Sequence, residues 1–476
     1  MSIAASPTVR LLVPDGWRPE RDYVARQVLG EWLGLAYRLE VQVRPNVRLE
    51  RLDAVGLPAV TMPDVLFAHP DGDWAASRLD GATPAPRLGV PPGFDARGDR
   101  TPEPVPVPFG VLAEDGLAWS EKDGDIALRA DVFGSVFALL ARLEEVERGP
   151  RDAYDRFPTK ASWAVAEEVV GRPVVDDLVD LLWLALRAAW PDLCRHEGPF
   201  QLCLTHDIDR PWSTLGRPAR VIGRSIAADL LIRRDPRLAV SRARAALDAG
   251  SGRVDRDPVA SFGFLATVSE RHGLKSTFYF QAGTGPGDED FRYSLTDAPF
   301  ASVLQDLHAR GHSIGLHGSF GSYASAGRLA HEARALRDRC RELGIVQDDF
   351  GNRQHYLRFR VPDTWRHLAA AGLAHDSSMG FADAPGFRSS TCREHDVFDV
   401  VERRPLGLRE RPLAVMDVTL LGYQGLDWPS AADSTKRVAA EARRRNGTLV
   451  LLVHNDTVAG DRARGHYREL VEELAS

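Results

Sequence analysis

Two aspartates follow an apolar run near the middle of the chain. The segment from Leu202 to Ile208 reads LCLTHDI, and one residue separates Asp207 from Asp209. In an extended strand, residues i and i+2 point to the same face, so both carboxylates would lie together at the C-terminal end of the strand. Close like charges are costly unless a cation or a proton-transfer role compensates for them. The pair therefore predicts a site, and the alternative is a polar strand end that caps the next helix.

Two histidines stand at the ends of other apolar runs. His317 ends the run that begins at Ser313, and His454 follows the run 449–453. A neutral imidazole beside carboxylates is a suitable ligand for zinc or another divalent ion. An imidazole at a strand end can also serve as a general acid, and for His454 the alternative is a satisfied core histidine. His312 lies at the opposite end of its strand, so we expect it to be structural.

The segment 352–360, NRQHYLRFR, combines three arginines and a histidine with apolar residues. An arginine aimed at a buried carboxylate would keep that carboxylate ionised and oriented, as a catalytic base requires. Surface exposure of the guanidinium is the alternative for Arg358 and Arg360. Two carboxylates near other strand ends could orient His454, and the sequence does not choose between them: Asp376 and Asp417.

Short apolar runs alternate with helical periods from about residue 199 onward. The runs are 201–206, 275–280, 312–317, 413–419 and 448–454. Such alternation predicts βα units around a mostly parallel sheet or barrel. The C-terminal ends of parallel strands share one rim, so the candidate residues would gather there.

The first part of the chain has a different pattern. At 476 residues the chain is too long for one ordinary core, which indicates two domains or a barrel with an appendage. The Pro- and Gly-rich tract 84–108 predicts a long surface loop or edge connection, and helical periods span 131–147 and 174–190. We therefore predict an N-terminal α/β accessory domain over 1–165, a helical linker over 166–198 and the barrel over 199–476.

Composition excludes several classes of protein. With 44% hydrophobic and 27% charged residues the chain is typical of globular proteins, and its net charge of −7 gives no reason to expect nucleic acid. The four cysteines lack CxxC spacing, which fits a reducing compartment. No apolar segment reaches the roughly 20 residues that cross a bilayer, and no secretory signal pattern is present, so we expect a cytoplasmic protein.

One insertion, 217–256, holds ten arginines against four aspartates. Its residues Ile222, Ile226 and Leu230 lie on one helical face. The segment could be a flap over the active site or a peripheral contact with anionic lipid or polyanionic glycan. The alternative is a solvated helical hairpin whose apolar face packs on the barrel.

Several motifs together resemble a known family. They are THDID, GLHGSFGSY, RQHYLRFRVP, HDSSMGFADAPGFR and LLVHND. From about residue 200 to 476 the chain resembles the polysaccharide deacetylases, the NodB-homology domain of carbohydrate esterase family four. It looks more narrowly like a subgroup that carries an extra N-terminal domain. The resemblance implies a distorted (β/α)7 barrel, a divalent metal, often zinc, and hydrolysis of N- or O-acetyl groups on sugars.

The resemblance also implies a role for individual residues. Asp207 matches the general base, His454 the general acid, and Arg353 or Arg358 the arginine that braces the base, with Arg353 the better fit. Asp209 and His317 match metal ligands. The family's second metal histidine stands four residues after the first, where this chain has Gly321. His206, His355 or another side chain would then complete the site. We assign the third ligand to His206 and substrate binding to four residues: His355, Arg358, Asp376 and Asp417.

These residues predict a metal-dependent hydrolase that removes acetyl groups from a carbohydrate. Two alternatives stay open. The protein could be a catalytically silent carbohydrate-binding homologue that kept the groove and lost the metal. It could also hydrolyse another non-peptide C–N bond, such as that of a cyclic amide.

Overall fold

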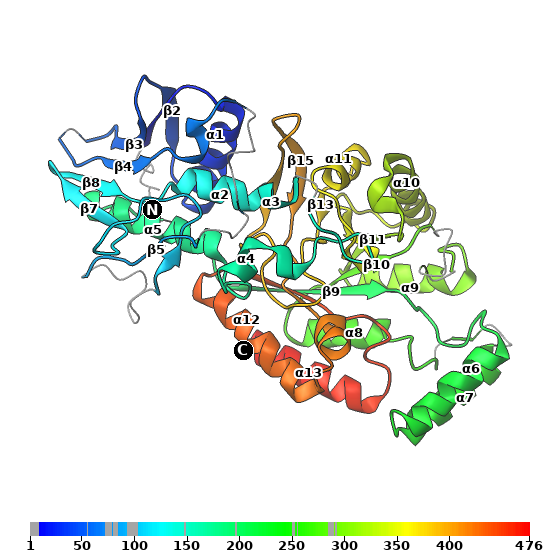
Figure 1. Ribbon diagram of the computed structural model, residues 1–476. Helices are drawn as coiled ribbons and strands as arrows, with labels where there is room; N and C mark the ends of the chain where they lie inside the picture. Colours follow the sequence, from blue (N-terminus) through cyan, green and yellow to red (C-terminus); the bar gives the residue numbers. More distant parts are fainter. Residues whose placement is uncertain are drawn as a thin grey trace, which may run out of the picture.

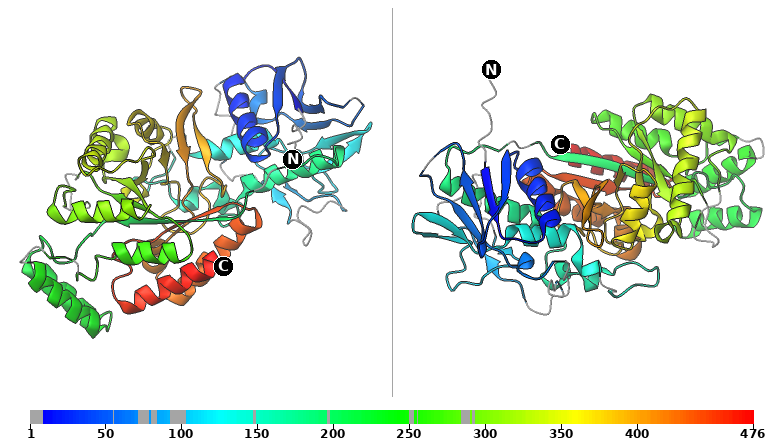
Figure 2. Two further views of the ribbon diagram at one scale, coloured as in Figure 1. Left: turned by 180° about the vertical axis from the view of Figure 1, so that it is seen from behind. Right: turned by 90° about the horizontal axis from the view of Figure 1, so that it is seen from above.

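The computed structural model contains two large sheets that lie side by side along the long axis of the molecule (Figures 1 and 2). It describes residues 9–54, 56–71, 79, 84–92, 103–146, 149–195, 198–249, 253–254, 256–283, 290 and 293–476. The chain is thus a mixed α/β protein, as predicted. Within the described part, no helix is both long enough and apolar enough to cross a membrane.

The first sheet has six strands in the order β2-β1-β3-β4-β8-β7. Its strands are β1 (Val9–Val13), β2 (Tyr37–Val41), β3 (Asn46–Arg51), β4 (Val60–Pro63), β7 (Trp119–Lys122) and β8 (Asp125–Leu128). Its helical segments are α1 (Arg18–Ala25), η1 (Arg26–Trp32), η2 (Leu66–Ala68), α2 (Val132–Leu140), α3 (Leu143–Val146), η4 (Thr159–Ala161), α4 (Trp163–Ala166) and α5 (Val174–Ala189). Residues of α1, α2 and α5 fill one apolar core with the sheet. The segment expected to link two domains thus contributes α5 to this first core, while the domain boundaries stay a prediction.

Two expectations for this part need refinement. The helix predicted over 131–147 is interrupted, because Arg142 has a left-handed backbone (φ 54°) between α2 and α3. Residue 147 lies outside the described residues. In the tract 84–108, β5 (Arg87–Leu88) and β6 (Val105–Pro106) pair as an antiparallel ribbon, whereas residues 93–102 are not described.

The second sheet has nine strands in the order β14-β15-β13-β12-β11-β10-β9-β17-β16. All neighbours are parallel except β14 and β15. The strands are β9 (Gln201–Ile208), β10 (Thr277–Phe280), β11 (Ser313–Gly318), β12 (Gly351–Gln354), β13 (His375–Asp376), β14 (His395–Asp399), β15 (Arg404–Glu410), β16 (Val415–Met416) and β17 (Thr448–Leu452). The sheet curls (Figure 1), and among the described strands no pairing joins its two ends. The number of seven barrel strands stays a prediction.

Helices cover the outer side of this curled sheet. They are α8 (Phe262–Arg271), α9 (Ala298–Ala309), α10 (Ala326–Glu342), α11 (Asp363–Ala370), α12 (Trp428–Arg444) and α13 (Asp461–Ala475), with short turns η5 (Ser322–Ala324), η6 (His355–Leu357) and η7 (Val418–Tyr423). Side chains alternate along β17: Leu449 and Leu451 pack toward the helices, whereas Val450 and Leu452 join a small cluster with Leu357. Both faces of the strand are therefore buried, as parallel strands require.

A helical hairpin follows β9. It consists of α6 (Ala219–Leu231) and α7 (Pro236–Ala249), and it projects from the rest of the molecule in Figure 1 and in the left view of Figure 2. The buried Asp229 carboxylate accepts hydrogen bonds from Arg233 and Arg242, which joins the two helices. The predicted apolar stripe is only partly covered, because Leu230 is 48% exposed. Residues 250–252 and 255 of the predicted insertion lie outside the described residues.

Buried ion pairs join the two parts of the chain. Glu145, on α3, receives both arms of the Arg388 guanidinium, with Nε 3.0 Å from Oε1 and Nη2 2.5 Å from Oε2, and Arg142 Nε donates to it at 2.8 Å. All three side chains are buried. Burial alone would raise the pKa of Glu145, but the charges of Arg388 and Arg142 lower it to about 2.

Candidate functional site

The C-terminal ends of four parallel strands bring the candidate residues to one edge of the second sheet. Asp207 lies on β9 and Asp209 follows it, His317 lies on β11, Arg353 and His355 lie on and after β12, and His454 follows β17. In the register of the sheet, His317 pairs with Arg353. The alternation of side chains explains the choice of face, because Ile314 and Leu316 point to the helices and His317 therefore points inward.

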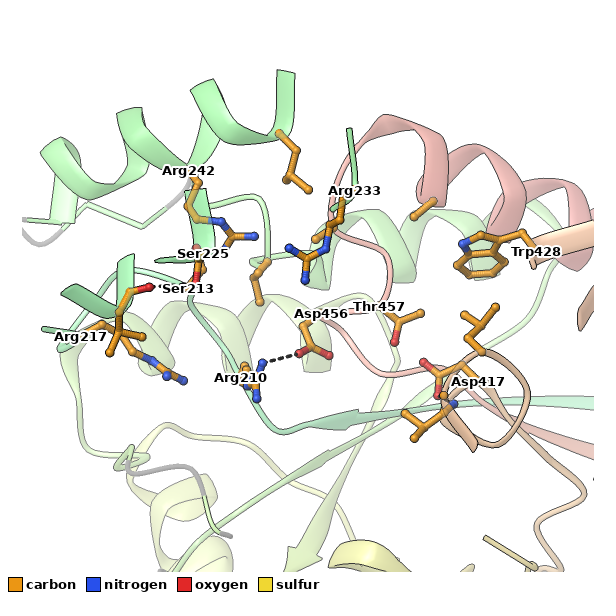
Figure 3. Close-up of a pocket in the computed structure, with 18 residues that line it drawn as sticks. Arg210, Ser213, Arg217, Ser225, Arg233, Arg242, Asp417, Trp428, Asp456 and Thr457 are labelled. Atoms are coloured by element: carbon orange, nitrogen blue, oxygen red, sulfur yellow. Dashed lines mark hydrogen bonds and ion pairs between the residues drawn. The ribbon is translucent and has the colours of Figure 1, made fainter. Parts of the chain in front are cut away.

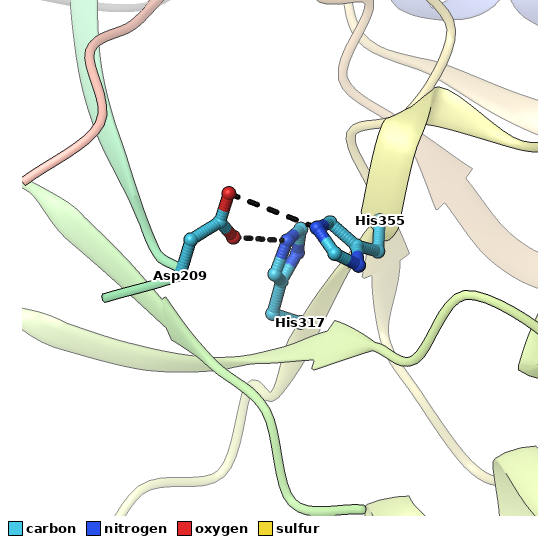
Figure 4. Close-up of side chains that lie close together, drawn as sticks. All are labelled: Asp209, His317 and His355. Atoms are coloured by element: carbon cyan, nitrogen blue, oxygen red, sulfur yellow. Dashed lines mark ion pairs between the residues drawn. The ribbon is translucent and has the colours of Figure 1, made fainter. Parts of the chain in front are cut away.

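Asp209, His317 and His355 form a group that could hold a metal ion (Figure 4). Their ligand atoms lie within 4.8 Å of one another. His317 Nε2 is 3.1 Å from Asp209 Oδ1, and His355 Nε2 is 3.7 Å from Asp209 Oδ2. Ligand atoms about 2.0 to 2.2 Å from a tetrahedral zinc ion are separated by roughly 3.4 Å, so the spacing suits such a centre.

In both imidazoles Nδ1 lies beside an oxygen acceptor, while Nε2 lies toward Asp209. His317 Nδ1 lies 2.9 Å from the carbonyl oxygen of Arg353, and His355 Nδ1 lies 2.9 Å from Asp290 Oδ1. Asp209 Oδ1 and His317 Nε2 are buried and form an ion pair 3.1 Å apart, but among the described residues neither makes a well-aligned hydrogen bond. Buried polar atoms without a well-aligned hydrogen bond are costly, and a bound cation would satisfy both of these atoms. The residues therefore fit a divalent metal.

The charges in this group are strongly coupled. Burial opposes the protonated form of His355, but the carboxylates of Asp209 and Asp290 raise its pKa to about 9. Burial likewise opposes ionisation of Asp209, yet His355 and His317 lower the pKa of this carboxyl well below its usual value. The pocket thus stabilises an ionised carboxylate beside the position that a cation would occupy.

The backbone after His355 has an unusual conformation. Tyr356 and Leu357 have φ of 61° and 55°, a left-handed region that non-glycine residues rarely adopt. The segment 151–156, here called the bracing loop, contacts this turn: Arg156 Nη1 donates to the Tyr356 carbonyl at 3.2 Å, and Arg151 Nη1 donates to the Phe359 carbonyl at 3.0 Å. The bracing loop therefore helps to fix the direction in which His355 points.

The structure does not bring His206 to this group, which corrects its assignment as a ligand. Its ring shares the outward face of β9 with Leu204 and packs 4.9 Å from the Phe278 ring, centroid to centroid. Its Nδ1 lies 2.8 Å from the carbonyl oxygen of Val453, and burial lowers its pKa to about 4. Neighbouring residues of a strand face opposite sides, so His206 and Asp207 cannot both point inward.

Position 321 contributes no ligand. A Cβ on Gly321 would lie 2.6 Å from Arg328 Nη1, so a side chain there would displace that guanidinium. The third side chain of the metal group is His355, at the end of β12, although substrate binding was its predicted role.

Asp207 and Arg353 face each other beside the metal group. Arg353 Nη1 lies 3.8 Å from Asp207 Oδ1, and Arg353 Nη2 donates to Ser377 Oγ at 2.9 Å. Both side chains are buried, and within the described chain Asp207 Oδ1 and Arg353 Nη1 lack hydrogen-bond partners. The guanidinium thus lies beside the carboxylate that the sequence predicts to be the base. Of the two candidate arginines, Arg353 is the one that forms an ion pair with Asp207, and its bracing role stays a prediction.

His454 is held by Asp417. Its Nδ1 lies 2.7 Å from Asp417 Oδ1, its backbone N–H donates to Asp417 Oδ2 at 2.9 Å, and its Nε2 lies 3.8 Å from Asp209 Oδ2. Burial opposes protonation of the ring, but the carboxylates of Asp417 and Asp209 raise the pKa of His454 well above its usual value. The ring can therefore donate a proton toward the metal group.

Two residues assigned to substrate binding lie elsewhere. Asp376 is buried beneath the rim, where its carboxylate accepts hydrogen bonds from Asn352 Nδ2 at 2.7 Å and from Ser378 N at 2.9 Å. Arg358 lies over the Phe320 ring, 3.9 Å from its centroid, and donates to the Phe320 carbonyl at 2.6 Å. Asp417 orients His454 and so acts through it. The roles of these residues in substrate binding stay predictions.

Asp290 is the residue that sequence analysis missed. It accepts a hydrogen bond from the Phe320 backbone N–H at 2.8 Å and contacts His355. It lies after β10 in a segment rich in Gly and Asp, which carries no strand or helix periodicity. A single acidic residue in such a segment gives no signal of its partner.

Comparisons with known proteins give a partial view. Residues 11–191 match the model of a family of unknown function, DUF7033, and no curated protein matches the chain. Similar solved structures include a candidate polysaccharide deacetylase from Mycobacterium smegmatis (17% identity, 60% of this chain and 86% of that chain, TM-score 0.38). A probable polysaccharide deacetylase from Pseudomonas aeruginosa PAO1 is also similar (14%, 60% and 89%, TM-score 0.36), as is the chitin deacetylase of Colletotrichum lindemuthianum (9%, 58% and 84%, TM-score 0.30). These low TM-scores add nothing to the side-chain geometry.

Proposed function

We propose that the protein is a metal-dependent hydrolase that removes acetyl groups, as amide or ester, from a carbohydrate. The observation that carries this proposal is the convergence of Asp209, His317 and His355, with ligand atoms that all lie within 4.8 Å of one another. Two imidazoles and one carboxylate are a donor set that zinc favours. The carbohydrate substrate comes from the resemblance of the sequence motifs.

The roles of the side chains follow from their positions. A divalent cation held by Asp209, His317 and His355 would polarise the acetyl carbonyl and make water more acidic. Asp207 then accepts the proton of the attacking water, and Arg353, 3.8 Å away, helps to position this carboxylate. His454, protonated and held by Asp417, donates a proton to the leaving nitrogen or oxygen.

The central experiment replaces Asp207 with asparagine. We expect the Asp207→Asn variant to retain bound metal, measured by elemental analysis, and to lose about 100- to 10,000-fold in acetate release from acetylated amino-sugar oligomers, the range typical of a general base. Asp209→Asn and His317→Ala should lose both metal and turnover. Asp306→Asn, the same chemical change on the exposed surface of α9, is the matched control. Full activity of Asp207→Asn would remove the base assignment.

The same assays separate the alternatives. A folded protein that binds glycan, but binds no metal and hydrolyses no substrate, would be a silent homologue. Hydrolysis of a cyclic ureide without acetate release would assign the site to another C–N bond. The close grouping of Asp209, His317 and His355 favours the metal-dependent enzyme over the silent protein.

We also propose that the α6–α7 hairpin makes a peripheral contact with an anionic bilayer. Leu231, Ile232 and Leu247 are 77%, 79% and 82% exposed. They lie on a segment, 217–249, that has eight arginines and three aspartates in a chain of net charge −7. Exposed apolar side chains flanked by arginine are typical of surfaces that bind anionic lipid.

A further inference from the structure

Two tyrosines beside the candidate site are exposed to solvent, unlike the other aromatic side chains. Among the residues that the structure describes, Tyr154 and Tyr423 are the only aromatic side chains more than a third exposed, at 37% and 46%. Tyrosine is common at binding surfaces, because its ring offers an apolar face and its hydroxyl a polar edge. The position of these two rings in the fold therefore bears on what the site binds.

One buried arginine joins the two tyrosines, although they lie far apart in the sequence. Tyr154 belongs to the bracing loop, and Tyr423 is the last residue of η7. Arg156 Nη1 donates to the Tyr423 hydroxyl at 3.2 Å. The guanidinium carbon of Arg156 also lies 4.8 Å from the centroid of the Tyr154 ring and 5.5 Å from that of the Tyr423 ring. The two rings are thus brought to one place on the surface.

Ring contacts connect this tyrosine pair with the metal group. The Tyr154 ring lies 5.1 Å from the Tyr356 ring, and the Tyr356 ring lies 4.7 Å from the imidazole of His355, centroid to centroid. On the other side, η7 follows directly after Asp417, which holds the His454 ring. The exposed rings therefore border the candidate site, at a distance that one or two sugar units would span.

Ion pairs and hydrogen bonds hold the bracing loop in place. Within the loop, Asp152 Oδ2 accepts a hydrogen bond from Arg156 Nε at 2.7 Å. Asp155 Oδ2 accepts one from Arg360 Nη2 at 2.6 Å and another from the Tyr323 hydroxyl, so the loop is tied to the second sheet. A ring that is already fixed loses little conformational freedom when a ligand packs on it. The loop thus presents the Tyr154 ring in a preorganised position.

Shielding of the Arg156 charge explains only part of this arrangement. A guanidinium group over an aromatic ring covers one face of that ring. More than a third of each tyrosine side chain still faces solvent. The outward surface of the pair is therefore available to the apolar face of a ligand.

The tyrosine pair is distinct from the cavity next to the α6–α7 hairpin. Val418, Leu421 and Gly422 of η7 line that cavity, which has a volume of about 580 Å³, and Asp417 lies at its wall (Figure 3). Tyr423, the next residue of η7, does not line it. The pair thus forms a surface of its own, on the side of the bracing loop.

We propose that Tyr154 and Tyr423 form an aromatic platform for the sugar rings that neighbour the acetylated unit of the glycan. The C–H groups on one face of a pyranose ring form an apolar surface, which packs on an aromatic ring. The inference rests on the proposed function and deepens it, because a platform beside the metal group selects an oligosaccharide over a monosaccharide. Tyr154 brings the first part of the chain into contact with the substrate.

A binding experiment tests the platform without any need for turnover. Tetramers of N-acetylglucosamine and of O-acetylated xylose are titrated by calorimetry into the full chain, which carries Asp207→Asn to suppress hydrolysis. In this background we expect Tyr154→Ala and Tyr423→Ala each to weaken binding of at least one tetramer about tenfold, the effect of one aromatic contact. Tyr154→Phe keeps the ring and should keep most of the affinity. Tyr37→Ala, the same change on the edge strand β2 of the first sheet, is the matched control.

Unchanged binding in both alanine variants at the platform would overturn the proposal, and so would an equal loss in Tyr37→Ala. Absence of binding of both tetramers at millimolar concentration, before any tyrosine is replaced, would overturn it too. The zinc affinity of the same variants separates contact from bracing. Parallel losses of zinc and of tetramer binding would show that the rings only restrain the turn after His355, and this would also refute the platform.

A second measurement compares acetate release from each tetramer and from its monosaccharide, with Asp207 in place. We expect a lower KM for the tetramer, and we expect Tyr154→Ala to reduce this preference about tenfold. If no probe releases acetate while a tetramer still binds through Tyr154, the proposed hydrolase activity fails and the platform stands. If tetramer and monosaccharide are hydrolysed with equal KM and neither alanine variant changes it, the platform fails and the hydrolase stands.

Discussion

Replacement of His355 by alanine tests the metal group directly. Three side chains are brought within ligand distance of one another, and His355 supplies one of the two imidazoles. Because Asp290 contacts Nδ1 of this ring, Nε2 is the candidate ligand atom that the alanine variant lacks. We expect the His355→Ala variant to fold, to bind zinc much more weakly and to release little acetate.

The magnitude follows from the number of ligands. Zinc sites with four protein ligands bind with about 10 to 16 kcal/mol, which is roughly 3 kcal/mol for each ligand. Loss of one ligand should therefore weaken zinc binding by about a hundredfold or more. Competition with a chromophoric chelator measures this dissociation constant without any need for a substrate.

His206→Asn is the matched control for this experiment. The asparagine amide can still donate to the Val453 carbonyl, as His206 Nδ1 is placed to do. Since the His206 ring points to the helices, zinc affinity should stay unchanged in this variant. A large loss of zinc in His206→Asn, with none in His355→Ala, would refute the ligand set and restore the assignment made from the sequence.

Two further predictions concern stability and the hairpin. The pKa of Glu145 is lowered from 4.5 to about 2 in the folded chain. Ionisation of Glu145 therefore stabilises the fold above pH 4.5 by roughly 3 kcal/mol. This contribution is lost as the pH falls toward 2. Denaturant unfolding should therefore show Glu145→Gln to be less stable by about 3 kcal/mol at pH 7, with the difference shrinking at low pH; a gap independent of pH would contradict the ion pairs with Arg388. The second prediction concerns the α6–α7 hairpin. The chain should sediment with vesicles that contain anionic phosphatidylglycerol but not with neutral phosphatidylcholine vesicles. The double variant Leu231→Gln/Ile232→Gln should bind the anionic vesicles more weakly, because both side chains are exposed. Binding that salt and these substitutions leave unchanged, or a shift to dimers in the unmodified protein, would argue against the bilayer contact.

The alternation of apolar runs and helices could be read from the sequence because both faces of the central strands are buried. The runs at 201–206 and 448–454 correspond to β9 and β17, and their ends carry Asp207 and His454. The run 413–419 behaves differently: β16 covers only two residues, since Asp417 accepts a hydrogen bond from the Val418 backbone N–H and begins a turn. Hydrophobicity alone does not show where a side chain competes with the neighbouring strand for a backbone N–H group.

The strand alternation also predicts the face of each side chain, and it excludes His206 from the group that contains Asp207. A residue adjacent to Asp207 in a strand must point to the other side of the sheet. The partnership of His355 with Asp290 could not be found in the same way, because 65 residues separate them and Asp290 follows no periodic pattern. Only the folded chain shows which distant acid faces which imidazole.

The left-handed turn at Tyr356 and Leu357 depends on contacts from outside the second sheet. Arg151 and Arg156 of the bracing loop donate to carbonyl groups on and just after this turn, and Arg360 forms an ion pair with Asp155 in the same loop. A truncated chain that started at residue 199 would keep every member of the metal group and every proton donor or acceptor assigned above. It would lack the scaffold that restrains the turn after His355, so in the proposed hydrolase the first part of the chain would contribute by geometry although it holds none of the proposed reacting groups.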